Sequence, residues 1–297
     1  YWLWMIILFS FVLQAVSYEF QSKMGNLLGQ NTYRAFLILN GVAGPILLGV
    51  AVATFFTGAA FYVNKGNMTD LGMPVISTWA NNWHGLDALA NPWNWALGLA
   101  VFFLSRILGA LYFINNIDEQ DLVRRARRSL WANTILFLAF FLGFLVRIWT
   151  MDGYKVDSLT KEVHMESYAY FLNLLEEPWI SAILLLGVVS VLWGIGRTLF
   201  KPTFERGIWF VGAGTVLTVL ALLLTVGYND TAYYPSTVDL QSSLTISNSC
   251  SSEFTLKVMA FVSILVPFVL AYIFYAWRSI DRKKIDAKEM RTGKHTY

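Results

Sequence analysis

The sequence predicts an all-α, polytopic bundle of transmembrane helices. Of its 297 residues, 56% are hydrophobic and only 14% are charged, and the mean hydropathy is +0.52. Soluble globular proteins carry about 25% charged residues, so this shortage of charge favours a bilayer environment. Aromatic residues reach 16%, and many Trp and Tyr lie near the ends of apolar runs, where membrane interfaces favour them.

Seven apolar runs are long enough to be membrane spans, since about 20 apolar residues cross the hydrocarbon core as a helix. The runs are too long for strands, and their Leu, Ala, Phe and Gly content suits packed membrane helices. The predicted spans cover about 1–18, 34–57, 93–115, 130–150, 178–200, 207–227 and 255–277. They predict a single transmembrane helical domain over 1–297.

Lys and Arg are shared unequally between the two sets of connecting segments. One set and the C-terminal tail carry 16 of them, and the opposite set carries 4. Because positively charged loops stay in the cytoplasm, we expect the 116–129 loop and the C-terminus to be cytoplasmic and residue 1 to face outward. The long loops 58–92, 151–177 and 228–254 should then form ordered caps outside. Topology therefore explains the basic residues better than nucleic-acid binding does.

The positions of its histidines predict that this chain binds no haem or metal by itself. A haem in a membrane bundle needs an axial His, Met or Cys that faces the interior. His84 and His164 fall in long loops, His295 falls in the tail, and Met is more often core filler. The lone Cys250 excludes an internal disulfide and a CxxC site. No catalytic motif is present, so no catalytic, cofactor-binding or metal-ligating residue is assigned.

Arg106 lies more than one helical turn from either end of the third predicted span. A charge in hydrocarbon costs at least about 2.5 kcal/mol, which makes Arg106 a functional candidate. Two interpretations have equal weight: a contact to a carboxylate, a lipid phosphate or another subunit, or a purely structural ion pair or carbonyl clamp. Arg147 lies near the end of its span beside Trp149, where snorkelling to the interface is expected.

Three further polar residues are candidates for a proton path or a subunit contact. Glu19, at the inner end of the first span, is expected to pair with Lys23 four residues on. The alternative is a position at the mouth of a proton pathway. Gln14 and Asn40 lie inside spans, where hydrogen bonding between helices is the expected role.

Small residues recur in two of the predicted spans. They are Gly41, Gly44 and Gly49 around Pro45, and Gly194 with Gly196. Small residues let helix backbones approach closely, so we expect tight helix packing at these glycines and a kink at the proline.

Short motifs follow one another in a fixed order along the chain. They are Tyr18-Glu19-Phe20 with Ser22-Lys23, Asn91-Pro92, Met151-Asp152-Gly153-Tyr154, Pro235-Ser236, Ser243-Leu244-Thr245, Ser251-Ser252, Thr255-Leu256 with Met259, and a final Tyr297. Their order and spacing resemble subunit II of the cytochrome bd quinol oxidases over essentially the whole chain. That family has two further helices upstream, which agrees with a sequence that starts at Tyr1 in apolar residues.

The resemblance implies a role in a respiratory complex of the bacterial inner membrane. In such a complex, quinol is oxidised at the outer face, oxygen is reduced to water, and haems b and d are held by subunit I. Subunit II is the haem-free partner, with a structural quinone or lipid and a small third subunit as further candidate components. The chain departs from the family at Gln14 and Gln21, where Arg is frequent, and at Arg106, where a neutral or His-like residue is expected.

A transporter subunit is the alternative function that we weighed against the oxidase subunit. It predicts broken helices and paired polar sites near the membrane midplane in repeated halves. Arg106 is the residue that supports it. A seven-helix receptor is disfavoured, because the lone Cys250 cannot form the usual outer disulfide.

Overall fold

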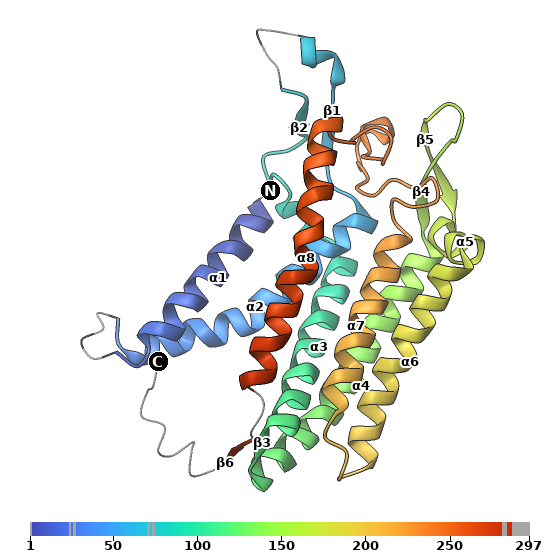
Figure 1. The fold of residues 1–297 in the computed structure, drawn as a ribbon. Helices are drawn as coiled ribbons and strands as arrows, with labels where there is room; N and C mark the ends of the chain where they lie inside the picture. The colour runs from blue at the N-terminus through green and yellow to red at the C-terminus, as the bar shows by residue number, and fades with distance from the viewer. Residues whose placement is uncertain are drawn as a thin grey trace.

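The structure, a computed structural model, describes residues 2–23, 25, 28–69, 72, 75–280 and 284–286. Seven of the helices in these residues are long and apolar enough to cross a membrane, which confirms the predicted all-α bundle (Figure 1). They are α1 (Trp2–Phe20), α2 (Gln30–Thr57), α3 (Pro92–Asn116), α4 (Gln120–Thr150), α6 (Pro178–Phe200), α7 (Gly207–Leu224) and α8 (Glu253–Ile280).

Helix α4 differs most from its predicted span. The apolar run begins at about 130, but the helix begins at Gln120, so most of the predicted 116–129 loop is helical. Apolarity marks only the part of a helix that lies in lipid. The preceding segment carries four arginines together with Ala and Leu, which are good helix formers, and the backbone stays helical through it.

Helices α3, α4, α6 and α7 form a four-helix bundle, with α2 packed against α3 and α1 against α2 (Figure 1). Ile107 and Leu111 of α3, Phe144 of α4, Ile180 of α6 and Val211 of α7 are almost fully buried in its core. The core of this bundle is therefore formed by side chains of the chain itself.

Glycines lie at close helix contacts, both inside the bundle and between α2 and the bundle. A Cβ on Gly49 of α2 would lie 2.6 Å from Cα of Gly98 in α3. A Cβ on Gly187 of α6 would lie 2.6 Å from Oγ1 of Thr218 in α7. The expectation of close packing holds for Gly49 but not for Gly196, where an added Cβ would meet nothing within 4 Å.

The other predicted small residues divide in the same way. Gly194 packs on α7, where an added Cβ would lie 2.8 Å from Val211, and Gly44 faces Asn40 and Phe11. Gly41 faces open space. Helix α2 continues through Pro45.

Helix α8 has almost no packing against the chain. None of its apolar window is buried, and apart from the intermediate Ala276 every residue from Glu253 to Ser279 is exposed. Helix α1 is also largely exposed, although Leu3 and Ile7 pack near Val50 of α2. The two helices therefore offer uncovered apolar surface.

The described residues of the segments 58–91, 151–177 and 225–252 gather at one end of the helices, here called the loop end (Figure 1). Strands β1 (Phe61–Val63) and β2 (Ser77–Trp79) pair antiparallel, as do β4 (Asp152–Val156) and β5 (Val163–Ser167), and α5 (Ala169–Glu176) follows. Three 3₁₀ turns lie among them: η1 (Lys65–Thr69), η2 (Leu86–Ala90) and η3 (Leu240–Ser242).

The segment 233–249 ties the two hairpins of the loop end together. Ser242 Oγ accepts a hydrogen bond of 2.9 Å from the backbone N–H of Val63, the last residue of β1. The amide of Gln241 exchanges two hydrogen bonds of 3.0 and 2.9 Å with the backbone of Val163 in β5. Ser236 and Ser243, both fully buried, bond to each other at 3.0 Å. The Pro-Ser and Ser-Leu-Thr motifs thus have a structural role.

Arg127 of α4 connects two helices at the opposite end of the bundle, here called the basic end. Its guanidinium donates to the backbone oxygens of Thr198, Pro202 and Phe204 in and after the last turn of α6, the bond to Pro202 measuring 2.6 Å. These carbonyls lack helical partners, and the arginine satisfies them. Nearby, β3 (Ile117–Asp118) pairs parallel with β6 (Ile285–Asp286), and Lys284 forms a 2.6 Å ion pair with Glu205.

Candidate functional site

The polar residues singled out in the sequence fall in three separate places. Gln14 and Asn40 meet between α1 and α2, where the Asn40 amide donates to Gln14 Oε1 and Ser10 Oγ donates to Asn40 Oδ1. The expected hydrogen bond between helices is confirmed. Ser17, one turn further along α1, is 1% exposed, and its hydroxyl has no partner among the described residues.

Glu19 lies at the basic end of α1, as expected. Its carboxylate forms a 2.5 Å ion pair with Lys23, four residues on. Both side chains are more than half exposed. Exposed pairs of this kind contribute little to stability, so the ion pair by itself gives no reason to assign a special role.

Arg106 lies in the third place, at the contact between α3 and α4. Its Nε donates to Asn133 Oδ1 at 3.0 Å, and its guanidinium carbon is 5.8 Å from the centre of the Phe102 ring. The Asn133 amide in turn donates to the backbone oxygen and hydroxyl of Ser129, at 2.7 and 2.9 Å. Arg147 instead stacks over Trp93 at the loop end, 5.7 Å from the ring centre.

Ser10 and Asn133 complete these clusters, and the sequence analysis did not identify them. Each is a polar residue inside an apolar helix, and Ser10, Gln14 and Ser17 follow a helical spacing that places them on one face. That spacing was the available signal. The choice of partner helix, which makes Asn133 the neighbour of Arg106, depends on tertiary packing.

A cavity of about 510 Å³ lies inside the four-helix bundle beside α2. Its walls are hydrocarbon, from side chains that include Phe56, Leu104, Phe137, Val188 and Leu222. Two threonines also line it, but Thr215 donates to Val211 O at 2.7 Å and Thr218 to Gly214 O at 2.8 Å. The cavity therefore suits an apolar chain and has no free polar group to orient a head group.

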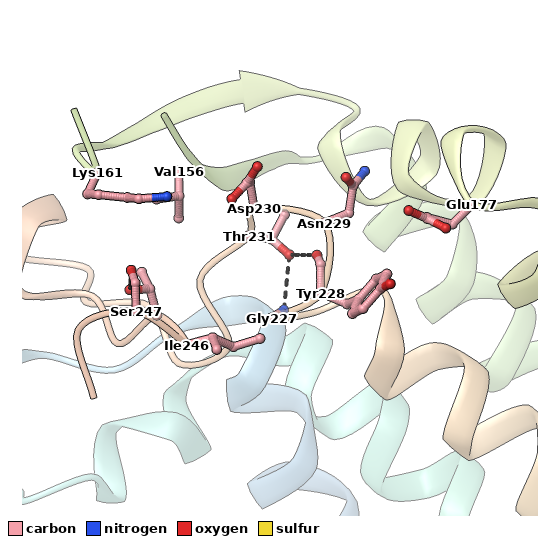
Figure 2. Close-up of a pocket in the computed structure, with 11 residues that line it drawn as sticks. Val156, Lys161, Glu177, Gly227, Tyr228, Asn229, Asp230, Thr231, Ile246 and Ser247 are labelled. Atoms are coloured by element: carbon pink, nitrogen blue, oxygen red, sulfur yellow. Dashed lines mark hydrogen bonds between the residues drawn. The ribbon is translucent and has the colours of Figure 1, made fainter. Parts of the chain in front are cut away.

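A second cavity, of about 380 Å³, is polar and lies at the loop end (Figure 2). Lys161 and Glu177 lie at its opposite sides, with Thr231 between them. Asp230 Oδ2 accepts from Ser158 Oγ at 2.7 Å, and Glu177 Oε2 accepts from Trp179 Nε1 at 2.7 Å. Both carboxylates already have partners inside the chain. None of the four candidate residues lines this cavity.

The two histidines that the structure describes lie at the loop end. His84 Nδ1 accepts a 2.9 Å hydrogen bond from Trp2 Nε1, and His164 lies on β5. His295 lies outside the described residues. Within the described part of the chain, no group of three His, Cys, Asp or Glu residues could hold a metal ion.

Tyrosine burial is the main electrostatic perturbation at the loop end. Tyr170 of α5 is 0% exposed, with its hydroxyl 3.5 Å from Phe56 O. Burial raises the pKa of Tyr170 far above its usual value, because a phenolate would lose its hydration. The same cause raises the pKa of Tyr154. Burial therefore disfavours the charged form of both phenols.

Comparison with known proteins places this chain in one family. The model of cytochrome bd terminal oxidase subunit II matches residues 1–280. The chain is 26% identical over 292 residues to cytochrome bd-I ubiquinol oxidase subunit 2 of Escherichia coli K12, covering 93% of this chain and 72% of the relative. It is 26% identical over 305 residues to a probable cytochrome oxidase subunit 2 of Haemophilus influenzae, covering 98% and 75%. A Bacillus subtilis cytochrome bd ubiquinol oxidase subunit 2 is 24% identical over 292 residues.

Proposed function

The chain belongs to the cytochrome bd terminal oxidase subunit II family and is a subunit of a quinol oxidase; from this premise we propose that it is the haem-free second subunit. In this proposal a larger subunit I holds haems b and d and carries out quinol oxidation and oxygen reduction. The present chain supports that subunit in the membrane and is not catalytic alone.

The placement of possible haem ligands carries the proposal. An axial ligand must face the interior of a helix bundle, and both described histidines lie at the loop end, outside the spans. The bundle interior offers a hydrocarbon cavity in place of a ligand pair. A transporter function has less support, because all seven candidate spans are continuous helices, whereas transporter sites typically interrupt theirs.

We assign the basic end to the cytoplasm of the bacterial inner membrane. Arg124, Arg125, Arg127 and Arg128 of α4 lie there, together with Arg197 and Lys201 at the end of α6. The excess of basic residues at cytoplasmic ends supports this orientation and a cytoplasmic C-terminus. A reporter that is active only in the cytoplasm should be active when it is fused after Asn116. Activity at this position of a reporter that works only after export would contradict the proposed orientation.

The uncovered helices α1 and α8 are the proposed contact surface for subunit I. Their exposed side chains are mostly apolar, and in α8 they surround the whole helix, including Phe261 and Phe268 at 72% and 70% exposure. Lipid could cover this surface as well, but a two-subunit complex needs an interface. We assign this interface to α8 because the described residues leave it uncovered.

The hydrocarbon cavity is the proposed site for the isoprenoid tail of a structural quinone or for a lipid acyl chain. Its volume of about 510 Å³ is within the range of small-molecule sites, and its walls exclude a charged ligand. A polar head group would then lie outside the cavity. The site would thus hold a tail for packing and supply no redox chemistry.

The experiment that tests the proposal is the optical spectrum of the complex purified through a tag on this chain. We expect b- and d-type haem bands, a larger co-purifying subunit, and oxygen consumption with quinol. The chain expressed alone and incubated with haem should show no stoichiometric Soret band. A one-to-one band that disappears in His84→Ala or His164→Ala would refute the haem-free assignment.

A further inference from the structure

Arg106 has a fixed orientation but unused hydrogen-bond donors. Asn133 is held by two hydrogen bonds to Ser129, so its Oδ1 is directed at Nε of Arg106, 3.0 Å away. That contact uses one N–H of the guanidinium. In the part of the chain that the structure describes, the two terminal nitrogens donate no hydrogen bond. The guanidinium carbon lies 5.8 Å from the centre of the Phe102 ring.

The guanidinium lies on the uncovered side of the α3–α4 pair. Ile107, the next residue of α3, is 0% exposed and faces the bundle, whereas Arg106 is exposed. Phe113, two turns along on the same side, is 52% exposed. The free edge of the fork therefore points out of this chain, toward whatever packs against α3 and α4.

The depth of Arg106 limits what can meet it. Ten residues separate it from Asn116 at the basic end of α3, about 15 Å along the helix, and about 21 Å separate it from Pro92. Helical side chains tilt toward the helix N-terminus, which for α3 is the loop end. The side chain therefore points toward the membrane midplane, away from the phosphates of the nearer leaflet. A protein side chain can reach this depth more readily than a lipid head group.

The surface next to Arg106 leaves room for a neighbouring helix. Gly109 lies one turn along α3, and an added Cβ there would meet nothing within 4 Å. A small residue on a membrane-facing surface lets another helix approach closely. An open glycine beside a guanidinium with unused donors thus combines space with charge.

We propose that Arg106 binds the carboxylate of an Asp or Glu on a transmembrane helix of the partner subunit, and that this helix packs over Gly109. The planar fork of terminal nitrogens matches both carboxylate oxygens, whereas the ammonium of a lysine would supply one point of contact. The inference rests on the proposed function only in requiring a partner subunit. Arg106 is then a positioning residue that fixes how the two subunits meet.

A cross-linking experiment on the assembled complex tests the proposal. Phe113→p-benzoylphenylalanine places a photoreactive group on the Arg106 side of α3. Illumination should yield a covalent adduct with the partner polypeptide. The matched control is the same replacement at Leu186 of α6, 63% exposed, where only lipid adducts are expected. Lipid adducts alone at position 113 would contradict the proposal and favour a lipid phosphate as the anion.

Charge reversal supplies the second test. Arg106→Glu should lower the yield of assembled complex at least tenfold, and Arg106→Lys should lower it less. Changing one membrane Asp or Glu of the partner to Arg should restore the yield of Arg106→Glu to within about twofold. The proposal fails if Arg106→Glu assembles normally or if no reversal restores it. If the wild-type chain co-purifies no haem-bearing subunit, the proposed function itself fails.

Discussion

The helices of the four-helix bundle and the pair α1 and α8 are all apolar enough to span a membrane, but the described residues cover very different shares of their surfaces. In the bundle, Ile107, Ile180 and Val211 are 0% exposed, whereas no part of the apolar window of α8 is buried. Hydropathy alone identifies both groups of helices as candidate membrane spans and does not show which of them are covered. The difference indicates that contacts within the present residues stabilise the bundle, whereas these residues leave the apolar surface of α1 and α8 uncovered. The proposed contact with subunit I concerns that uncovered surface.

The largest expected effect is at the glycine contacts of the bundle. In Gly187→Val, the new Cβ would lie 2.6 Å from Thr218 Oγ1 and 2.7 Å from Thr218 N. Overpacking of this kind costs about 1–3 kcal/mol or more, because backbone atoms cannot move aside. We expect the yield of folded complex to fall at least tenfold, measured by haem per milligram of membrane protein.

Gly196→Val in the same helix is the matched control, since its new Cβ would meet nothing within 4 Å. It should leave the yield within about twofold of the wild type. Equal losses in the two variants would mean that helix α6 tolerates valine at neither glycine. Close packing against Thr218 would then not explain the effect of Gly187→Val.

The uncovered surface of α8 should give the next largest effect, and one of a different kind. In the double variant Phe261→Ala and Phe268→Ala, this chain should still insert, but several-fold less haem subunit should co-purify, because packing at the interface is lost. Leu185 and Leu186 on α6, 65% and 63% exposed, provide the control. Their replacement by Ala should not change co-purification. Equal effects on α6 and α8 would remove the proposed distinction.

Much of the fold could be predicted from the sequence, because long apolar runs reveal membrane helices without reference to tertiary contacts. The seven candidate spans agree with the prediction. The start of α4 at Gln120 could not be read from apolarity, since four arginines continue the helix beyond the lipid. The position of α8 apart from the bundle could not be predicted either, because its sequence resembles those of the buried helices.

Prediction of the polar sites was less complete. Glu19 pairs with Lys23 as expected, because charges four residues apart meet on a helix. Gln14 and Asn40 form the expected kind of contact, a hydrogen bond between helices, although the sequence did not identify them as partners of each other. Asn133 could not be identified as the partner of Arg106, because the register between α3 and α4 depends on side-chain packing. The hydrocarbon cavity also arises from packing and has no local sequence signal.

A smaller effect is expected at the α1–α2 contact. Asn40→Leu removes the bonds to both Gln14 and Ser10. Hydrogen bonds between membrane helices average about 0.6 kcal/mol and reach about 1.7 kcal/mol, so the Tm of the purified complex should fall by a few degrees. Gln14→Leu should lower the Tm less than Asn40→Leu does. The fall in Tm of the double variant should be smaller than the sum of the falls in the two single variants. Strict additivity would show that the two side chains do not interact.

The smallest effect should come from the tip of the β4–β5 hairpin at the loop end. Backbone N–H groups of Thr160 and Leu159, each 2.8 Å from Asp157 Oδ1, lower the pKa of this carboxyl. A carboxyl with a lowered pKa stabilises the turn above its unfolded pKa and loses that contribution as the pH falls through the folded value. The protection factors of the amides of residues 159–162, which compare each exchange rate with the intrinsic rate at the same pH, should therefore fall only below the usual aspartate range. Asp157→Ala should remove this pH-dependent fall in protection.

The structure of the assembled complex, determined by electron cryomicroscopy in lipid nanodiscs, tests the central claim most directly. The account predicts that a haem-bearing subunit covers α1 and α8, so that Phe261 and Phe268 lose most of their exposure while Leu185 and Leu186 remain in lipid. It also predicts no haem within this chain. A complex in which lipid surrounds α8 on all sides and the partner packs on α6 and α7, or in which this chain ligates a haem, would contradict it.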